Sequence, residues 1–156
     1  MSDKITSPFP SKIMLAVEDV EYIKKGVALA ISLSKMWNSK LYLIHVVEEK
    51  KVPKEFEEWE ETSGDLRTNY FDSVGERDPF VKEVETEVKN AGVNDVEVIY
   101  AHGNPADEIL LAIKENNIDC VIMGGHEHSN FRTSFAGSVP EKVCTHASST
   151  TCIIVR

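Results

Sequence analysis

Short apolar segments alternate along this chain with segments of helical periodicity, and this alternation restricts the possible folds more than any other feature. Segments with the length and composition of buried strands occur at 12–17, 40–47, 96–101, 120–123 and 151–155. Amphipathic helices are predicted over 19–37 and 79–91, from Pro105 onward, and from 137–138 through about 147. Strands that alternate with helices pair in parallel and are joined by right-handed crossovers. The pattern therefore predicts an α/β fold, a doubly wound parallel sheet with helices on both faces.

The first helix shows the periodicity most clearly. Its expected buried face consists of Ile23, Val27, Ala30, Ile31 and Ser34, widened by Leu29, Leu33 and Met36. Asp19 is its expected N-cap. Asp78-Pro79 and Asn104-Pro105 start two later helices by placing proline at the first helical position, and Gly92 ends the first of these.

Two segments lie outside this regular pattern, so we divide the chain into a flexible leader at 1–11 and one domain at 12–156. The domain carries an acidic insertion at about 48–76, which includes Phe56 and Trp59. A connection this long is uncommon in a compact domain. It is interpreted as a solvated acidic loop anchored by the two aromatic residues, or alternatively as an interaction element or mobile insertion.

The charge balance excludes two classes of partner. Lys and Arg number 17 against 26 Asp and Glu, giving a net charge of -9. Broad nucleic-acid binding and docking on an anionic membrane both need a basic surface, so neither is expected. No apolar run approaches the roughly 20 residues that span a bilayer, and the N-terminus has no signal-peptide core.

The cysteines indicate the compartment. Cys120, Cys144 and Cys152 are odd in number, form no C-x-x-C pair and lie in apolar segments. Cys120 and Cys152 fall in strands expected to be central and are predicted to be core residues. Free buried thiols are typical of a reducing compartment, so a cytoplasmic protein is expected.

Ligands of doubly wound sheets bind beyond the carboxyl ends of the strands. Glu18 and Asp19 follow the first strand, His45 to Val47 end the second, His102-Gly103 follow the third and 124–128 (GGHEH) follow the fourth. No G-x-G-x-x-G, P-loop or G-x-S-x-G motif is present, so the corresponding dinucleotide, P-loop and hydrolase sites are not predicted.

The segment from Met123 to Val143 (MGGHEHSNFRTSFAGSVPEKV) contains the clearest candidate site. Gly124 and Gly125 allow close approach of a phosphate, and free amides at the helix start, 137–139, favour an anion. Ser138-x-x-Glu141 is also a capping box, which would explain Ser138 without any ligand. Both interpretations remain open on the residues alone.

These residues resemble the universal stress protein family, whose signature is G-x-x-G, nine residues, then G-[ST]. Met123-Gly124 and 137–139 (GSV) stand at the matching places, and LAVED, LIHVV, HGNPADEI and DCVIMGG extend the resemblance over nearly the whole chain. The resemblance implies a five-stranded sheet in the order 3-2-1-4-5, like that of the adenine-nucleotide alpha-hydrolases. It also implies a homodimer formed through the last strand, whose apolar edge would otherwise be exposed.

The resemblance further implies a site for ATP or AMP. Ala16, Val17 and Glu18 would contact the nucleoside, and Val46 would lie beside the adenine. The remaining positions would line the loop and hold the phosphates: Met123, Gly124, His126, Glu127, Gly137, Ser138 and Val139.

Two positions depart from the family pattern. Glu18 stands where Asp is usual, and Glu127 replaces the second glycine of the signature. A carboxylate about 5 Å from a phosphate costs roughly 3 kcal/mol at an effective dielectric of ~20. Mg²⁺ bridging Glu127 and the phosphates would reverse that sign.

The histidines allow a rival hypothesis, a transition-metal site. Its ligands would come from Glu18, His45, His102, His126, Glu127 and His128. A structural role is the competing interpretation, since His45 and His126 both match family habits.

Three functions follow from these alternatives. The first is a non-catalytic stress-response module with an ATP-type site weakened by Glu127. The second is an interaction protein that has lost the nucleotide and acts through its dimer and acidic insertion. The third is a slow ATPase in which Glu127 or His126 orients water.

Overall fold

The computed structural model describes residues 9–17, 20–47, 79–125 and 139–156. The acidic insertion, most of the predicted leader and the N-cap Asp19 lie outside the described residues. Elements appear in the order β1 (Lys12–Ala16), α1 (Val20–Trp37), β2 (Lys40–Val47), α3 (Pro79–Asn90), β3 (Val96–His102), α4 (Pro105–Asn116), β4 (Cys120–Gly124), α5 (Val139–His146) and β5 (Thr151–Val155).

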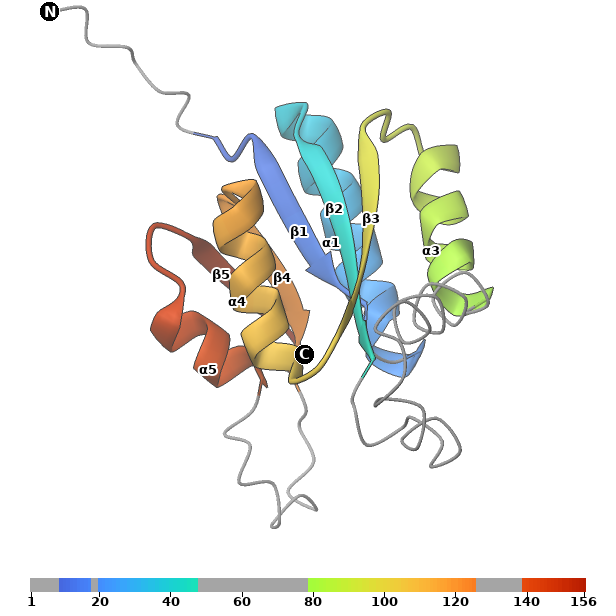
Figure 1. Cartoon of the computed structure of the whole chain (residues 1–156). Coiled ribbons are helices and arrows are strands. Elements are labelled where there is room, and N and C mark those ends of the chain that lie inside the picture. The colour runs from blue at the N-terminus through green and yellow to red at the C-terminus, as the bar shows by residue number, and fades with distance from the viewer. Residues whose placement is uncertain (1–8, 18–19, 48–78, 126–138) are drawn as a thin grey trace, which may run out of the picture.

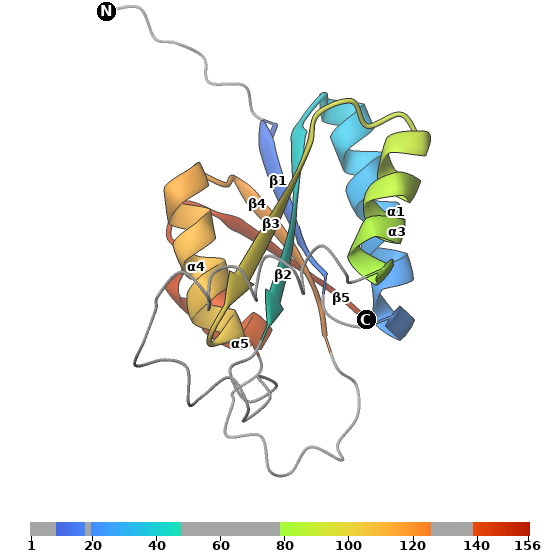
Figure 2. The same ribbon diagram turned by 45° about the vertical axis from the view of Figure 1, so that its right-hand side comes forward.

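The strands form one five-stranded sheet in the order β3-β2-β1-β4-β5, and each neighbouring pair is parallel. Helices α1 and α3 cover one face, while α4 and α5 cover the other (Figure 1; Figure 2). The predicted doubly wound α/β fold and its strand order are therefore confirmed.

Two apolar cores lie on opposite faces of this sheet because successive strand residues point to opposite sides. On β1, Ile13 and Leu15 pack toward α1 and α3, whereas Met14 and Ala16 pack toward α4 and α5. Strand β2 is buried on both faces from Leu41 to Ile44. The nearly continuous apolar strands of the sequence thus reflect a sheet covered on both sides.

Two expectations about buried residues are wrong. Met36 has an exposed fraction of 71% and does not widen the buried face of α1. Cys152 lies on β5, which is an edge strand of this sheet, and is only partly buried. Ile23, Val27, Ala30 and Ser34 are buried as predicted.

Burial keeps two of the thiols protonated at neutral pH. It raises the pKa of Cys120, which is buried, to about 11. Burial, together with a hydrogen bond to Cys144, raises the pKa of Cys152 to about 12. Cys120 is the core thiol that the sequence predicts.

The predicted helix boundaries of α4 are explained by its caps. The Asn104 side chain accepts a hydrogen bond from the main-chain N–H of Asp107 at 3.2 Å, and Pro105 occupies the first turn. Asn117 ends the helix in the left-handed conformation, where its N–H bonds the carbonyl of Ile113. Gly92 follows α3 with φ of +99°, as expected for a glycine after a helix.

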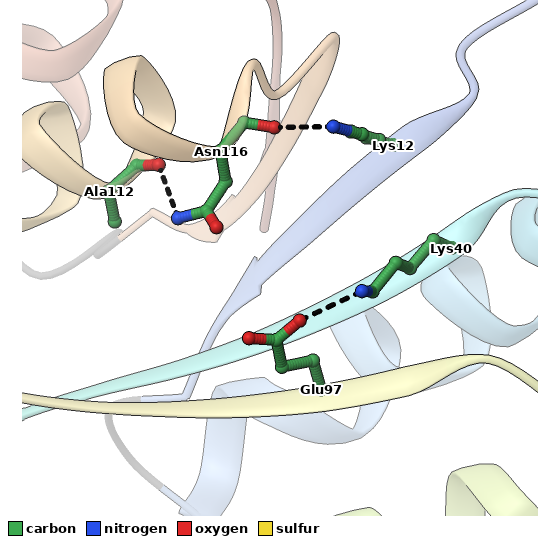
Figure 3. Close-up of polar contacts among 5 residues, drawn as sticks. All are labelled: Lys12, Lys40, Glu97, Ala112 and Asn116. Atoms are coloured by element: carbon green, nitrogen blue, oxygen red, sulfur yellow. Dashed lines mark hydrogen bonds and ion pairs between the residues drawn. The ribbon is translucent and has the colours of Figure 1, made fainter.

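Polar contacts hold together the edge where the strands begin, which we call the amino edge. Asp119 Oδ2 accepts from Ser11 N at 3.0 Å, Ser11 Oγ at 2.9 Å and Lys12 N at 2.9 Å. Lys12 Nζ also donates to the carbonyl of Asn116 at the end of α4 (Figure 3). These contacts fasten the start of β1 to the segment that leads into β4.

A second contact at the amino edge joins β2 to β3. Lys40 Nζ lies 2.8 Å from Glu97 Oε2 and stacks over the Tyr42 ring (Figure 3). The hydrogen bond with Glu97 raises the pKa of the Lys40 amine. The lysine therefore stays charged throughout the physiological range.

Within the described ranges, none of the helices is long and apolar enough to cross a membrane.

Candidate functional site

The edge of the sheet where the strands end, the carboxyl edge, brings several predicted site residues together. Strand order reverses between β1 and β4, which is where ligands of such sheets bind. Ala16 ends β1, Met123 precedes the last residue of β4, and Val46 lies near the end of β2. Val139 begins α5 on the same face.

These four residues share one apolar surface. Ala16 and Met123 belong to the core under α4 and α5, and Val46 and Val139 are partly buried against it. Strand pairing explains the arrangement: Ala16 is opposite Ile44, so Val46 extends beyond the end of β1 on the same face. The result is a partly exposed apolar ledge beside a helix start, suited to a flat ring with an anionic tail.

Val17 has a different place from the one predicted. Its side chain is fully buried in the core on the opposite face, under α1 and α3. Its N–H donates to the carbonyl of Ile44 at 2.8 Å, and its carbonyl oxygen lies 2.8 Å from His45 Nδ1. Both main-chain groups of Val17 are therefore engaged in joining the end of β1 to β2.

His45 acquires a structural role from this contact. A carbonyl oxygen can only accept, so Nδ1 of His45 must carry the proton that it donates to Val17. The ring thus fastens the end of β1, two residues before Asp19, rather than pointing freely toward a metal. The competing structural interpretation of this histidine gains support.

Gly125 is needed for packing. Its N–H donates to the carbonyl of Val155 at 2.8 Å, so this amide is used in the sheet and not by a phosphate. A Cβ built on Gly125 would lie 2.6 Å from Ile154 Cγ2, inside van der Waals contact. The glycine permits β4 and β5 to stay paired where the chain leaves β4.

Substitution of Gly125 by alanine is accordingly expected to lower the free energy of unfolding by about 1–2 kcal/mol, as overpacking does elsewhere. Urea unfolding followed by circular dichroism measures the change. In an Ile154→Leu background the Cγ2 atom is absent, so the same substitution should cost clearly less. An equal cost in both backgrounds would show that Ile154 is not the obstacle.

The rest of the predicted nucleotide site lies outside the described residues: Glu18, His126, Glu127, Gly137 and Ser138. The same holds for most of the proposed metal ligands. In the part of the chain that the structure describes, no group of three or more His, Cys, Asp or Glu side chains is placed to hold a metal ion.

One residue near the candidate site was missed by sequence reasoning. Arg156 follows β5, and its Cγ lies 3.5 Å from a Cβ built on Gly125. The signal was present in the sequence only indirectly. Arg156 comes two residues after Ile154, so the two share a face if the last strand pairs with the fourth.

Comparison with known proteins agrees with this geometry. The model of the universal stress protein family matches residues 10–156. Universal stress protein YxiE of Bacillus subtilis is 27% identical over 147 residues, covering 85% of this chain and 90% of that protein.

Two solved structures share the fold. A universal stress protein in complex with cAMP superposes with a TM-score of 0.66 at 18% identity, covering 95% of this chain and 98% of the other. A universal stress protein from Archaeoglobus fulgidus in complex with dAMP gives 0.64 at 15%, covering 93% and 97%. The strand order, the carboxyl-edge ledge and the family match lead to one conclusion: this chain belongs to the universal stress protein family.

Proposed function

We propose that this protein is a regulatory module of the stress response that binds an adenine nucleotide at the carboxyl edge of its sheet. The observation that carries the proposal is the shared apolar surface of Ala16, Val46, Met123 and Val139, which adjoins the start of α5. An adenine and ribose would lie on this ledge, and the phosphates would lie toward the helix start.

Two relatives support the type of ligand. Structures of similar fold are described in complex with cAMP and with dAMP, which share an adenine base and one phosphate. AMP and ATP carry the same base. The ledge is apolar where the base would lie, which favours a ring system over a purely anionic ligand.

The proposed role is binding without turnover. The chain has no P-loop and no nucleophile elbow, and the notable carboxylate of its phosphate motif, Glu127, opposes a bound phosphate unless a cation bridges them. We assign the ligand a sensing role, with Mg²⁺ as its companion. The protonated thiols of Cys120 and Cys152 favour a cytoplasmic location.

A homodimer formed through β5 is part of the proposal. Strand β5 is at the edge of the described sheet, and its Ile154 has an exposed fraction of 41%. Exposed apolar edge strands are usually covered, and a second copy of β5 would supply both the main-chain partners and an apolar neighbour. The resemblance to the family supports the same interface.

The test is calorimetric titration of nucleotide-stripped protein with ATP and AMP, with and without Mg²⁺. We expect micromolar binding of ATP that requires the metal, because only the cation removes the repulsion between Glu127 and the phosphates. AMP, with fewer phosphate charges, should depend less on Mg²⁺. Absence of heat for both nucleotides under both conditions would contradict the proposal.

That negative result would favour the second candidate function, an interaction protein. The specific observation for it is Glu127 at a position where the motif has glycine. In that case the acidic insertion and the β5 edge would be the surfaces on which to search for partners.

A further inference from the structure

The side chain of Arg156 lies beside the point where the chain leaves β4. Val155 is opposite Gly124 in the β4–β5 pairing, and Gly125 N–H donates to the Val155 carbonyl at 2.8 Å. A Cβ built on Gly125 would lie 3.5 Å from Cγ of Arg156. The aliphatic part of the arginine therefore packs over Gly125, on the same face as Met123.

The main chain of Arg156 is held in this place from the other face of the sheet. Lys25 Nζ, on α1, donates to a main-chain oxygen of Arg156 at 2.9 Å. The residue is thus fixed on two sides, by Gly125 and by Lys25, while it remains exposed to solvent overall. Its position follows from strand pairing and a tether and does not depend on the loop after Gly125.

The charge of the chain makes a cation at this place significant. The protein carries a net charge of -9, and the phosphate motif contains a carboxylate at position 127. A nucleotide bound on the ledge needs positive charge near its phosphates. A guanidinium provides two parallel hydrogen bonds to a phosphate and keeps its charge at all physiological pH values.

We propose that Arg156 is the residue that pairs with the phosphates of the bound nucleotide. The inference rests on the proposed function and adds a specificity determinant to it: Arg156 makes the site prefer nucleotides over nucleosides. Its contribution grows with the number of phosphate charges and falls with ionic strength, because it acts through charge at a solvent-exposed site.

The experiment measures the affinity of the full chain for adenosine, AMP and ATP in the natural protein and in Arg156→Gln. We expect the substitution to weaken ATP binding about tenfold and AMP binding less, and to leave adenosine binding unchanged. The ATP affinity of the variant should also depend less steeply on salt. Arg156→Lys, which keeps the charge without the planar fork, should retain part of the affinity.

Lys24→Gln is the matched control. Lys24 is exposed on α1, so its replacement removes one positive charge without removing a contact of Arg156. We expect at most a small change in ATP affinity in this variant. Urea unfolding of all variants shows whether each is folded as well as the natural chain.

The outcomes separate this inference from the function on which it rests. Equal weakening for adenosine and ATP, or equal effects of the Lys24 and Arg156 substitutions, would overturn the assignment of Arg156. ATP binding that is indifferent to Arg156→Gln would overturn the assignment while leaving the proposed function standing. A natural chain that binds none of the three ligands would overturn both.

Discussion

Replacement of Glu127 by glycine is expected to tighten the binding of magnesium-free ATP by on the order of a hundredfold. The substitution restores the glycine of the family signature and removes a carboxylate from a place where the motif approaches phosphate. Repulsion of roughly 3 kcal/mol at about 5 Å accounts for this factor. Calorimetric titration without Mg²⁺ measures it.

Glu127→Gln separates the two effects of the natural residue. Glutamine keeps the bulk of the side chain and loses its charge, so most of the gain should appear if repulsion dominates. With Mg²⁺ present the ranking should narrow, because Glu127 would then help to hold the cation. Affinity for ATP that is the same in all three proteins would show that position 127 does not face the phosphates.

Substitution of Asp119 by alanine is expected to lower the free energy of unfolding by about 2–3 kcal/mol, since hydrogen bonds to a charged acceptor are among the stronger ones. One carboxylate oxygen accepts from Ser11 N, Ser11 Oγ and Lys12 N at 2.9–3.0 Å. The main chain of Asp119 also bonds Lys12 and Thr151. Loss of the carboxylate leaves the partly buried N–H of Lys12 without its acceptor. Urea unfolding gives the change in free energy.

Asp95→Ala is the matched control for that measurement. Asp95 is an exposed aspartate in the turn before β3, and its replacement should change stability by less than about 0.5 kcal/mol. Because Asp119 lies at the amino edge, its substitution should leave nucleotide affinity unchanged at temperatures where the variant is folded. A variant as stable as the natural chain would show that solvent replaces the carboxylate at no cost.

The fold could be predicted from the sequence because its signals are local and repeated. Strand-length apolar segments, and proline after Asp78 and Asn104, indicate the elements, and parallel pairing follows from their alternation with helices. Errors arose where a residue was counted as apolar without regard to its angle. Met36 lies about 150° around the helix from the centre of the buried stripe, at 100° per residue, and is exposed.

The candidate site was less predictable because its geometry depends on contacts between distant segments. Periodicity places Ala16, Val46 and Met123 on strands, and only the observed register shows that they share a face while Val17 does not. The contact of His45 with Val17 and the approach of Arg156 to Gly125 depend on strand pairing across long sequence separations. The predicted roles of Glu18, His126, Glu127, Gly137 and Ser138 stay predictions.

The two separate cores have a consequence for how this protein can evolve. Substitutions on opposite faces of the sheet share no partners, so their effects on stability should be nearly additive. The acidic insertion joins β2 to α3, a helix of the face opposite the nucleotide ledge (Figure 1). Mutations that adapt the α3 face to a new partner can therefore accumulate without selection against them at the ledge. One half of the molecule is free to diverge while the other conserves its ligand.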